Sequence, residues 1–188
     1  MTLLVVGLIL FLGVHLVPAI PAWRRALVTR HGEDGYKRYF SLASGLGFLL
    51  IIVGFAMSER GPQLFTPVAG ARMVAPLLVT LAFILLAAAN MRGYLRATLR
   101  HPMLIGVLLW SGVHFLANGS TRATILFGAF FVWAVLDLVA AVSRPSTRIF
   151  APQAKYDAMS VVGGIVVALA VMSVHRWLFG VSVVPFSF

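Results

Sequence analysis

The sequence predicts an all-α membrane protein, a bundle of about six transmembrane helices that forms a single domain over residues 1–188. Three observations predict this class. Hydrophobic residues make up 61% of the chain, and the mean hydropathy is +0.99. Charged residues make up only 11%, whereas soluble domains carry about 25%. Six stretches of about 20 residues, the length that crosses a bilayer, would leave only short loops in this chain.

The apolar stretches cover residues 2–22, 40–57, 72–91, 101–118, 122–142 and 158–179. The first has no basic start and no small-residue cleavage site, so we expect a retained helix with Pro18 and Pro21 near its end. The second is short, and the third begins within residues 71–76. In the fourth, Pro102 fits the first helical turn, where a missing N–H does no harm. The fifth and sixth are continuous apolar runs of spanning length.

The basic residues predict how the chain is oriented. Fifteen Lys and Arg residues against five Asp and Glu give a net charge of +10. Because they lie in short loops, they indicate topology and contact with anionic lipid rather than nucleic acid. Eleven lie on one side: Arg24, Arg25, Arg30, Lys37, Arg38, Arg92, Arg96, Arg100, Arg144, Arg148 and Lys155. Four lie on the other: Arg60, Arg72, Arg122 and Arg176. Positive charge stays in the cytoplasm, so we expect both termini on the non-cytoplasmic side.

Several kinds of chemistry are excluded by composition. The chain has no cysteine, hence no disulfide, thiolate metal site or cysteine nucleophile. It has no HExxH motif and no paired intramembrane carboxylates, so we do not expect a bare divalent metal site. The glycine pairs allow helices to approach closely rather than bind phosphate. These pairs are Gly45 with Gly47 and Gly163 with Gly164.

Polar side chains inside apolar stretches are costly in hydrocarbon and often mark function. They are His15, His101, His114, His175 and Asp137. For Asp137 we expect an ion pair with Arg144 or Arg100, or a cytoplasmic-side polar pair with His101. His31, beside Gly32-Glu33-Asp34, is expected to be a solvated loop residue. A hydrolase triad of Ser111, His114 and Asp137 is disfavoured, because Asp137 lies near the opposite membrane face from His114.

The fourth stretch is the richest in polar residues. At 100° per residue, its residues Val107, Trp110, Ser111, His114 and Asn118 share one helical face, and His101 lies about 140° away. His114 either bonds a neighbouring helix or ligates a metal or haem. Haem is the more plausible ligand, because two histidines on different helices can clamp an apolar macrocycle inside a bundle.

Depth in the membrane limits which histidine could pair with His114. At 1.5 Å per residue from the cytoplasmic edge, His15 lies about 13 Å deep, His114 about 21 Å and His175 about 27 Å. His101 lies at the edge itself and is excluded as the second axial ligand. Depth leaves His15 and His175 open as the partner of His114.

Three segments of the chain carry a family resemblance: Phe11-Leu12-Gly13-Val14-His15, Gly32-Glu33 through Tyr36-Lys37-Arg38-Tyr39-Phe40-Ser41, and Arg100-His101-Pro102 through Trp110, His114 and Asn118-Gly119. Together they resemble the NnrU family of bacterial membrane proteins, at least over residues 3–142. The resemblance implies an NnrU-type transmembrane domain in the bacterial inner membrane. It also implies an association with denitrification and nitric-oxide metabolism.

The fourth stretch is also similar to the 15-cis-zeta-carotene isomerase, an integral membrane enzyme whose haem b is held by two histidines. Its motif Arg-His-Pro-x-x-x-Gly-x-x-x-Trp-x-x-x-His matches residues 100–114. The resemblance implies His114 and His15 as axial ligands of haem b, with Trp110, Ser111 and Asn118 lining the haem face. It implies a redox-regulated isomerase of a hydrophobic small molecule. A thiolate ligand is impossible here, because Ser111 stands where the isomerase has cysteine.

Two alternatives belong to other functional classes. Isoprenylcysteine carboxyl methyltransferases share the Arg-His-Pro-x-x-x-Gly pattern of residues 100–106. They follow it with an acidic pair that helps to bind S-adenosylmethionine, and this chain has no such pair after Asp137. The other alternative is a non-catalytic accessory protein for denitrification enzymes, in which the histidines serve as interhelical hydrogen bonds.

Overall fold

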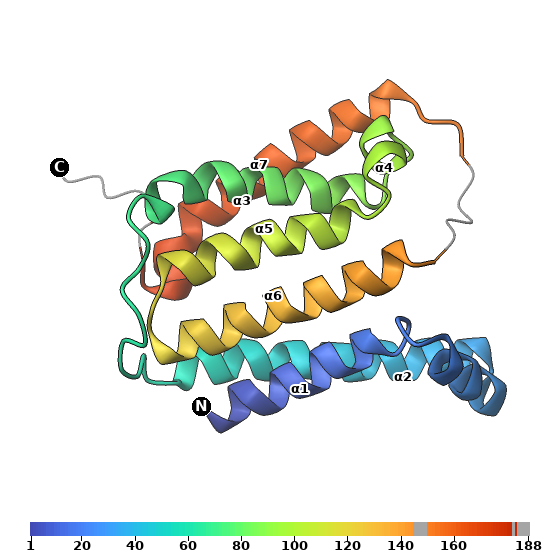
Figure 1. The fold of residues 1–188 in the computed structure, drawn as a ribbon, viewed down its shortest axis with the longest axis horizontal. Coiled ribbons are helices and arrows are strands. Elements are labelled where there is room, and N and C mark those ends of the chain that lie inside the picture. The colour runs from blue at the N-terminus through green and yellow to red at the C-terminus, as the bar shows by residue number, and fades with distance from the viewer. Residues whose placement is uncertain (145–149, 182, 184–188) are drawn as a thin grey trace.

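The computed structural model describes residues 1–144, 150–181 and 183. These residues form α-helices and no strand, with one isolated antiparallel bridge between Gln63 and Ser120. The helices, labelled in Figure 1, are α1 (Thr2–Leu16), α2 (Pro21–Met57), α3 (Ala71–Ala88), α4 (Tyr94–Leu99), α5 (Pro102–Ala117), α6 (Thr121–Val142) and α7 (Ala154–Phe179). The predicted all-α class is confirmed.

Among the described residues, four helices are long and apolar enough to cross a bilayer: α2, α3, α6 and α7. Helices α1 and α5 are also apolar but have only 15 and 16 residues. At 1.5 Å per residue they measure about 22 and 24 Å, less than the roughly 30 Å of hydrocarbon in a bilayer. The chain is therefore a multi-pass membrane protein. Four of its predicted crossings have both the length and the hydropathy of a membrane-spanning helix.

The first connection differs from the sequence prediction. Helix α1 ends at Leu16 rather than near residue 22, and the expected loop over residues 23–39 is helical. Pro21 begins α2, because proline is favoured at the first helical position, where its missing N–H costs nothing. Arg, Lys and Glu are good helix formers, so the charged residues that follow do not interrupt the helix.

Gly32 divides α2 into two arms. Its φ of 72° and ψ of 166° are not helical, and a positive φ is a conformation that glycine adopts at little steric cost. We call residues 21–31 the first arm and residues 33–57 the second arm. Only the second arm contains the apolar stretch that was predicted to cross the membrane.

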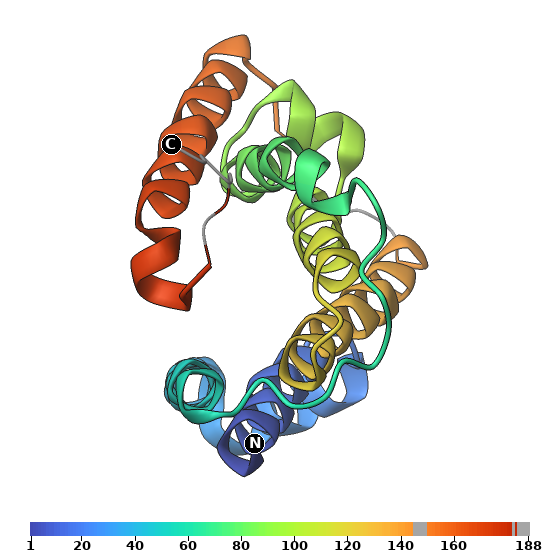
Figure 2. The same cartoon turned by 90° about the vertical axis from the view of Figure 1, so that its left-hand side faces the viewer.

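The long helices follow an open arc, which Figure 2 shows from one end. Helix α7 packs on α3, α3 on α5, α5 on α6, α6 on α1, and α1 on α2. Helices α7 and α2 form the two ends of this arc. The main cluster of buried hydrophobic residues lies where α1, α5 and α6 meet, and it includes Leu8, Leu104, Leu126, Phe127 and Trp133.

One member of each glycine pair makes the close helix contact that was predicted. A Cβ on Gly47 would lie 2.7 Å from the backbone N of Phe11, and a Cβ on Gly164 would lie 2.5 Å from the Cα of Ile84. Gly45 and Gly163 have no such neighbour within 4 Å. Close packing therefore accounts for Gly47 in α2 and Gly164 in α7.

The connections gather at the two ends of the molecule as the charge pattern predicted (Figure 1). The first arm of α2, helix α4 and the start of α7 lie at one end, on the right of the figure. The N-terminus and the α2–α3 and α5–α6 connections lie at the other end. The predicted basic side therefore corresponds to one end of the bundle, except that Arg148 lies outside the described residues.

Candidate functional site

His114 lies in the last turn of α5 and is half-buried. Its Nδ1 lies 2.8 Å from the backbone carbonyl oxygen of Trp110. A carbonyl oxygen only accepts, so Nδ1 must carry the proton in this bond. In the neutral ring, Nε2 then holds a free lone pair, which is the state that a metal ligand requires.

Aromatic rings surround His114. Its ring stacks on Phe127 at 4.7 Å between centroids, and it lies 5.5 Å from Trp110. Trp110 in turn meets Phe127 at 5.2 Å and Phe130 at 5.4 Å, both nearly edge-on. The cluster presents apolar faces beside the free Nε2, as a site for an apolar macrocycle would.

His15 has the same arrangement in the last turn of α1. Its Nδ1 lies 2.7 Å from the carbonyl oxygen of Phe11, which again leaves Nε2 free in the neutral ring. The rings of Phe11, Phe40 and Trp133 lie 4.3, 5.1 and 5.9 Å from it. The indole N–H of Trp133 is buried and has no hydrogen-bond partner among the described residues. A buried unpaired donor is costly, so this position favours a polar group of a ligand or a water beside His15.

The structure separates His15 from His114 along the bundle. Helices α1 and α5 run in opposite directions (Figure 1), and each histidine lies in the last turn of its helix. A series of ring contacts joins them. It passes from Phe11 to Phe130 at 5.8 Å and from Phe130 to Trp110 at 5.4 Å. The two histidines thus belong to one aromatic cluster at different depths.

His175 lies closer in depth to His114. Helix α7 runs in the same direction as α5 (Figure 1), and His175 is near the end of α7. His175 shares this end of the bundle with His114 across α3, which packs on both α5 and α7. Its Nδ1 lies 2.7 Å from the carbonyl oxygen of Val181, which leaves its Nε2 free in the neutral ring as well.

Ser111 and Asn118 hold the backbone of α5. Ser111 is fully buried, and its hydroxyl donates to the carbonyl oxygen of Val107 at 2.6 Å. The Nδ2 of Asn118 donates to the carbonyl oxygen of His114 at 2.9 Å. Asn118 is not part of the helix itself: α5 ends at Ala117, and Asn118 is its C-cap residue, with φ −136° and ψ 110°.

Asp137 lies at the other end of the bundle from His114. Its Oδ1 is 4.0 Å from Nη2 of Arg144, so Arg144 is the ion-pair partner among the two arginines that the sequence suggested. Arg144 also donates through Nη1 to the carbonyl oxygen of Pro18 at 3.1 Å. His101 is the N-cap residue of α5. The Asp137 carboxylate thus has Arg144 as its ion-pair partner at this end of the bundle.

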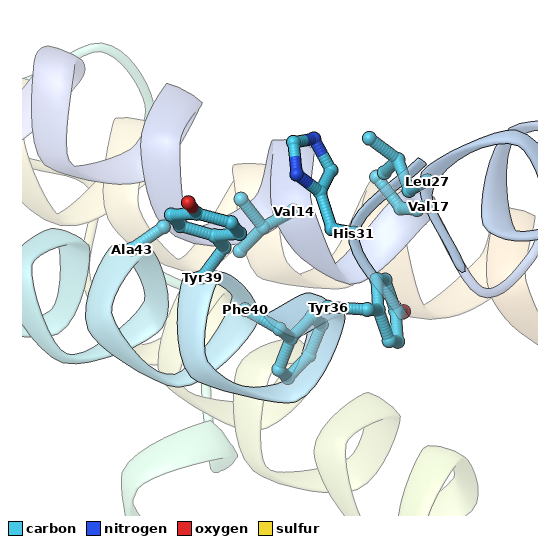
Figure 3. Close-up of a pocket in the computed structure, with 8 residues that line it drawn as sticks. All are labelled: Val14, Val17, Leu27, His31, Tyr36, Tyr39, Phe40 and Ala43. Carbon is cyan, nitrogen blue, oxygen red and sulfur yellow. The ribbon is translucent and has the colours of Figure 1, made fainter. Parts of the chain in front are cut away.

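His31 is exposed, as expected, but it lies in a helix and not in the predicted loop. It lies in the first arm of α2 and lines a cavity of about 370 Å³ with Val14, Val17, Leu27, Tyr36, Tyr39, Phe40 and Ala43 (Figure 3). The spacing of Tyr36, Tyr39, Phe40 and Ala43 is that of one helical face. This periodicity was available in the sequence, but it crosses a predicted boundary: Tyr36 and Tyr39 fall in the expected loop, and Phe40 and Ala43 fall in the stretch of residues 40–57.

The described residues hold no group of three or more His, Asp or Glu side chains that could bind a metal ion by themselves.

The comparisons with known proteins give one match. The model of a family described as NnrU protein matches residues 3–183, nearly the whole chain. No curated protein and no solved structure was found to match.

Proposed function

The chain belongs to the NnrU family, and from this we propose that it is a haem b-binding protein of the bacterial inner membrane. In this proposal all six apolar stretches cross the bilayer, and the N-terminus lies on the non-cytoplasmic side. His114 would be one of the two histidines that hold the haem iron. The resemblance to the carotenoid isomerase supports His15 as the other.

The observation that carries the proposal is the hydrogen bond from Nδ1 of His114 to the Trp110 carbonyl oxygen. It fixes the tautomer and leaves Nε2 free within an apolar aromatic cluster. The residues present fit a haem in two further respects. His15 and His175 are each bonded through Nδ1 in the same way, which leaves Nε2 as the lone-pair nitrogen of the neutral ring. Within the part of the chain that the structure describes, the buried N–H of Trp133 beside His15 has no partner.

The proposal leaves two candidates for the second histidine that would hold the haem iron. The family resemblance supports His15, whereas the matching depth of α5 and α7 ends supports His175. With haem bound, the iron would supply a redox-active centre that binds small ligands when a position opens. The protein's own contribution is to hold two neutral imidazoles, to exclude water with Phe127, Phe130 and Trp110, and to keep the site apolar.

Three histidine variants test the proposal. The chain is purified in mild detergent from haem-supplied cells, and the haem-to-protein ratio is measured. We expect His114→Ala to lose haem while helix content by circular dichroism is retained. One of His15→Ala and His175→Ala should lose haem too, which would identify the second ligand. His31→Ala, an exposed histidine outside the cluster, is the control and should keep haem.

Two results would overturn the proposal. One is full haem occupancy in the His114→Ala variant. The other is full occupancy in both the His15→Ala and His175→Ala variants, because neither histidine would then be required beside His114 to hold the haem.

The biological role that we propose follows from the family. A haem protein of this type would act in denitrification or nitric-oxide metabolism, by sensing or by redox-regulated isomerisation of a lipid-soluble substrate. The alternative is a non-catalytic accessory protein in which the three histidines only bond backbone carbonyls. The observation that favours it is that each Nδ1 already has such a bond. A colourless protein that copurifies with denitrification enzymes would support this alternative.

A further inference from the structure

A cavity lies beside the kink of α2. It lies between the end of α1 and the two arms of α2, which meet at Gly32. Figure 3 shows Val17 and Leu27 on one side of His31 and Val14 on the other, with Tyr36, Tyr39 and Phe40 projecting from the second arm. Its volume, about 370 Å³, is within the usual range of small-molecule sites. The lining is mostly apolar, with His31 and two tyrosine hydroxyls as its polar groups.

The rim of the cavity carries more positive than negative charge. The guanidinium of Arg24 lies 5.5 Å from the centre of the Tyr36 ring, which lines the cavity. Its Nη2 is 2.8 Å from Oε1 of Glu33, and Nζ of Lys37 is 3.9 Å from the same oxygen. Two cations therefore share the Glu33 carboxylate. Residues 21–38, which line much of the cavity, hold five cations (Arg24, Arg25, Arg30, Lys37 and Arg38) against two carboxylates (Glu33 and Asp34), so the segment carries net positive charge.

The first arm has the features of a helix that lies in the membrane interface. Trp23 is 57% exposed and Leu27 is 37% exposed, while Arg25 and Arg30 are exposed on the same arm. Tryptophan favours the headgroup level, and basic amphipathic helices lie in the interface of anionic bilayers. The cavity beneath this arm would therefore open where acyl chains meet headgroups.

We propose that this cavity binds one anionic phospholipid. Part of an acyl chain occupies the space lined by Val14, Leu27 and Phe40. The phosphate group lies at the rim, where Arg24 and Lys37 supply the charge. Glu33 competes with the phosphate for both cations. The proposal requires only that the chain lies in a membrane, and it is independent of haem.

The test is native mass spectrometry of the detergent-solubilised chain with phosphatidylglycerol or phosphatidylcholine added. We expect one phosphatidylglycerol per chain to be retained in preference to phosphatidylcholine. Arg24→Gln and Lys37→Gln should each weaken this retention about fivefold, the effect of one basic residue near an anionic surface. Glu33→Gln should strengthen it, because the competing carboxylate is removed. Arg25→Gln, the same charge change one residue away, is the matched control and should have little effect.

A second pair of variants tests the acyl-chain space. Ala43→Phe fills the cavity and should abolish retention, whereas Leu46→Phe, at an exposed position of the same arm, should not. The proposal is overturned if both lipids are retained equally or if Arg25→Gln acts as strongly as Arg24→Gln. It is also overturned if millimolar inorganic phosphate displaces the lipid, since the site would then recognise phosphate alone.

Discussion

Arg122 is a basic residue that holds two helices together, in addition to its place in the charge pattern that predicts the orientation of the chain. Its Nη1 donates to the carbonyl oxygens of Phe55 and Ser58, at 3.1 and 2.8 Å, and its guanidinium lies 4.5 Å over the Phe55 ring. The last carbonyls of a helix have no partner within the helix, and near a membrane they have little water to bond. Arg122, at the start of α6, therefore supplies the hydrogen-bond donors that the carbonyl oxygens at the end of α2 lack.

Replacing this side chain should destabilise the molecule. We expect Arg122→Gln to lower the free energy of unfolding by about 1–3 kcal/mol, the usual cost of leaving buried acceptors unpaired. Arg60→Gln is the control, because Arg60 is exposed and repels Arg122. Thermal unfolding in one detergent compares the two. Equal midpoints for both variants would mean that the carbonyl contacts contribute nothing to stability.

At the scale of elements, the sequence predicted most helices because their apolar runs are long. The ends of α3 (Ala71–Ala88) and α6 (Thr121–Val142) lie close to the predicted ones. The predicted loop between the first two apolar stretches was wrong. A high density of charged residues indicates exposure to water, but it does not break a helix. Helix α4 was missed because its stability depends on a distant group. The carboxylate of Asp157 accepts from the backbone N–H of Tyr94 and Leu95, at 2.8 and 2.9 Å.

Adjacent glycines in α7 provide a matched test of helix packing. The Cβ of a Gly164→Ala variant would press on the Ile84 backbone, so α3 and α7 must move apart. We expect a loss of about 1–3 kcal/mol. Gly163→Ala meets open space and should leave stability unchanged or raise it slightly, because alanine favours helix. Unfolding midpoints in detergent measure both. Similar losses for the two variants would contradict the packing of α7 on α3.

At the scale of the whole molecule, the arc places the basic connections at one end, which we assign to the cytoplasm. The chain has no cysteine, so single cysteines can report on topology. Glu59→Cys lies in the α2–α3 connection and Thr29→Cys in the first arm, and both positions are exposed. In cells with a permeabilised outer membrane, an impermeant maleimide should label the first variant only. Labelling of the second alone would reverse the orientation.

The candidate site could be predicted in part. Sequence patterns identify polar residues in apolar helices, and so His15, His114 and His175 were found. Their hydrogen bonds to carbonyls four residues earlier, for His15 and His114, depend on the rotamer of each ring and not on the pattern. The relative depth of two helix ends depends on helix direction and on where each helix stops. For that reason depth left both His15 and His175 open in the sequence, and only the resemblance favoured His15. The structure places the ends of α5 and α7 at the same end of the bundle.

The absorption spectrum of the whole protein tests the central claim most directly. The wild-type chain is purified in mild detergent from haem-supplied cells and measured oxidised and then dithionite-reduced. Our account predicts a Soret band, with sharp α and β bands on reduction, as expected for a low-spin haem with two strong nitrogen ligands. A colourless protein, folded by circular dichroism, would contradict it.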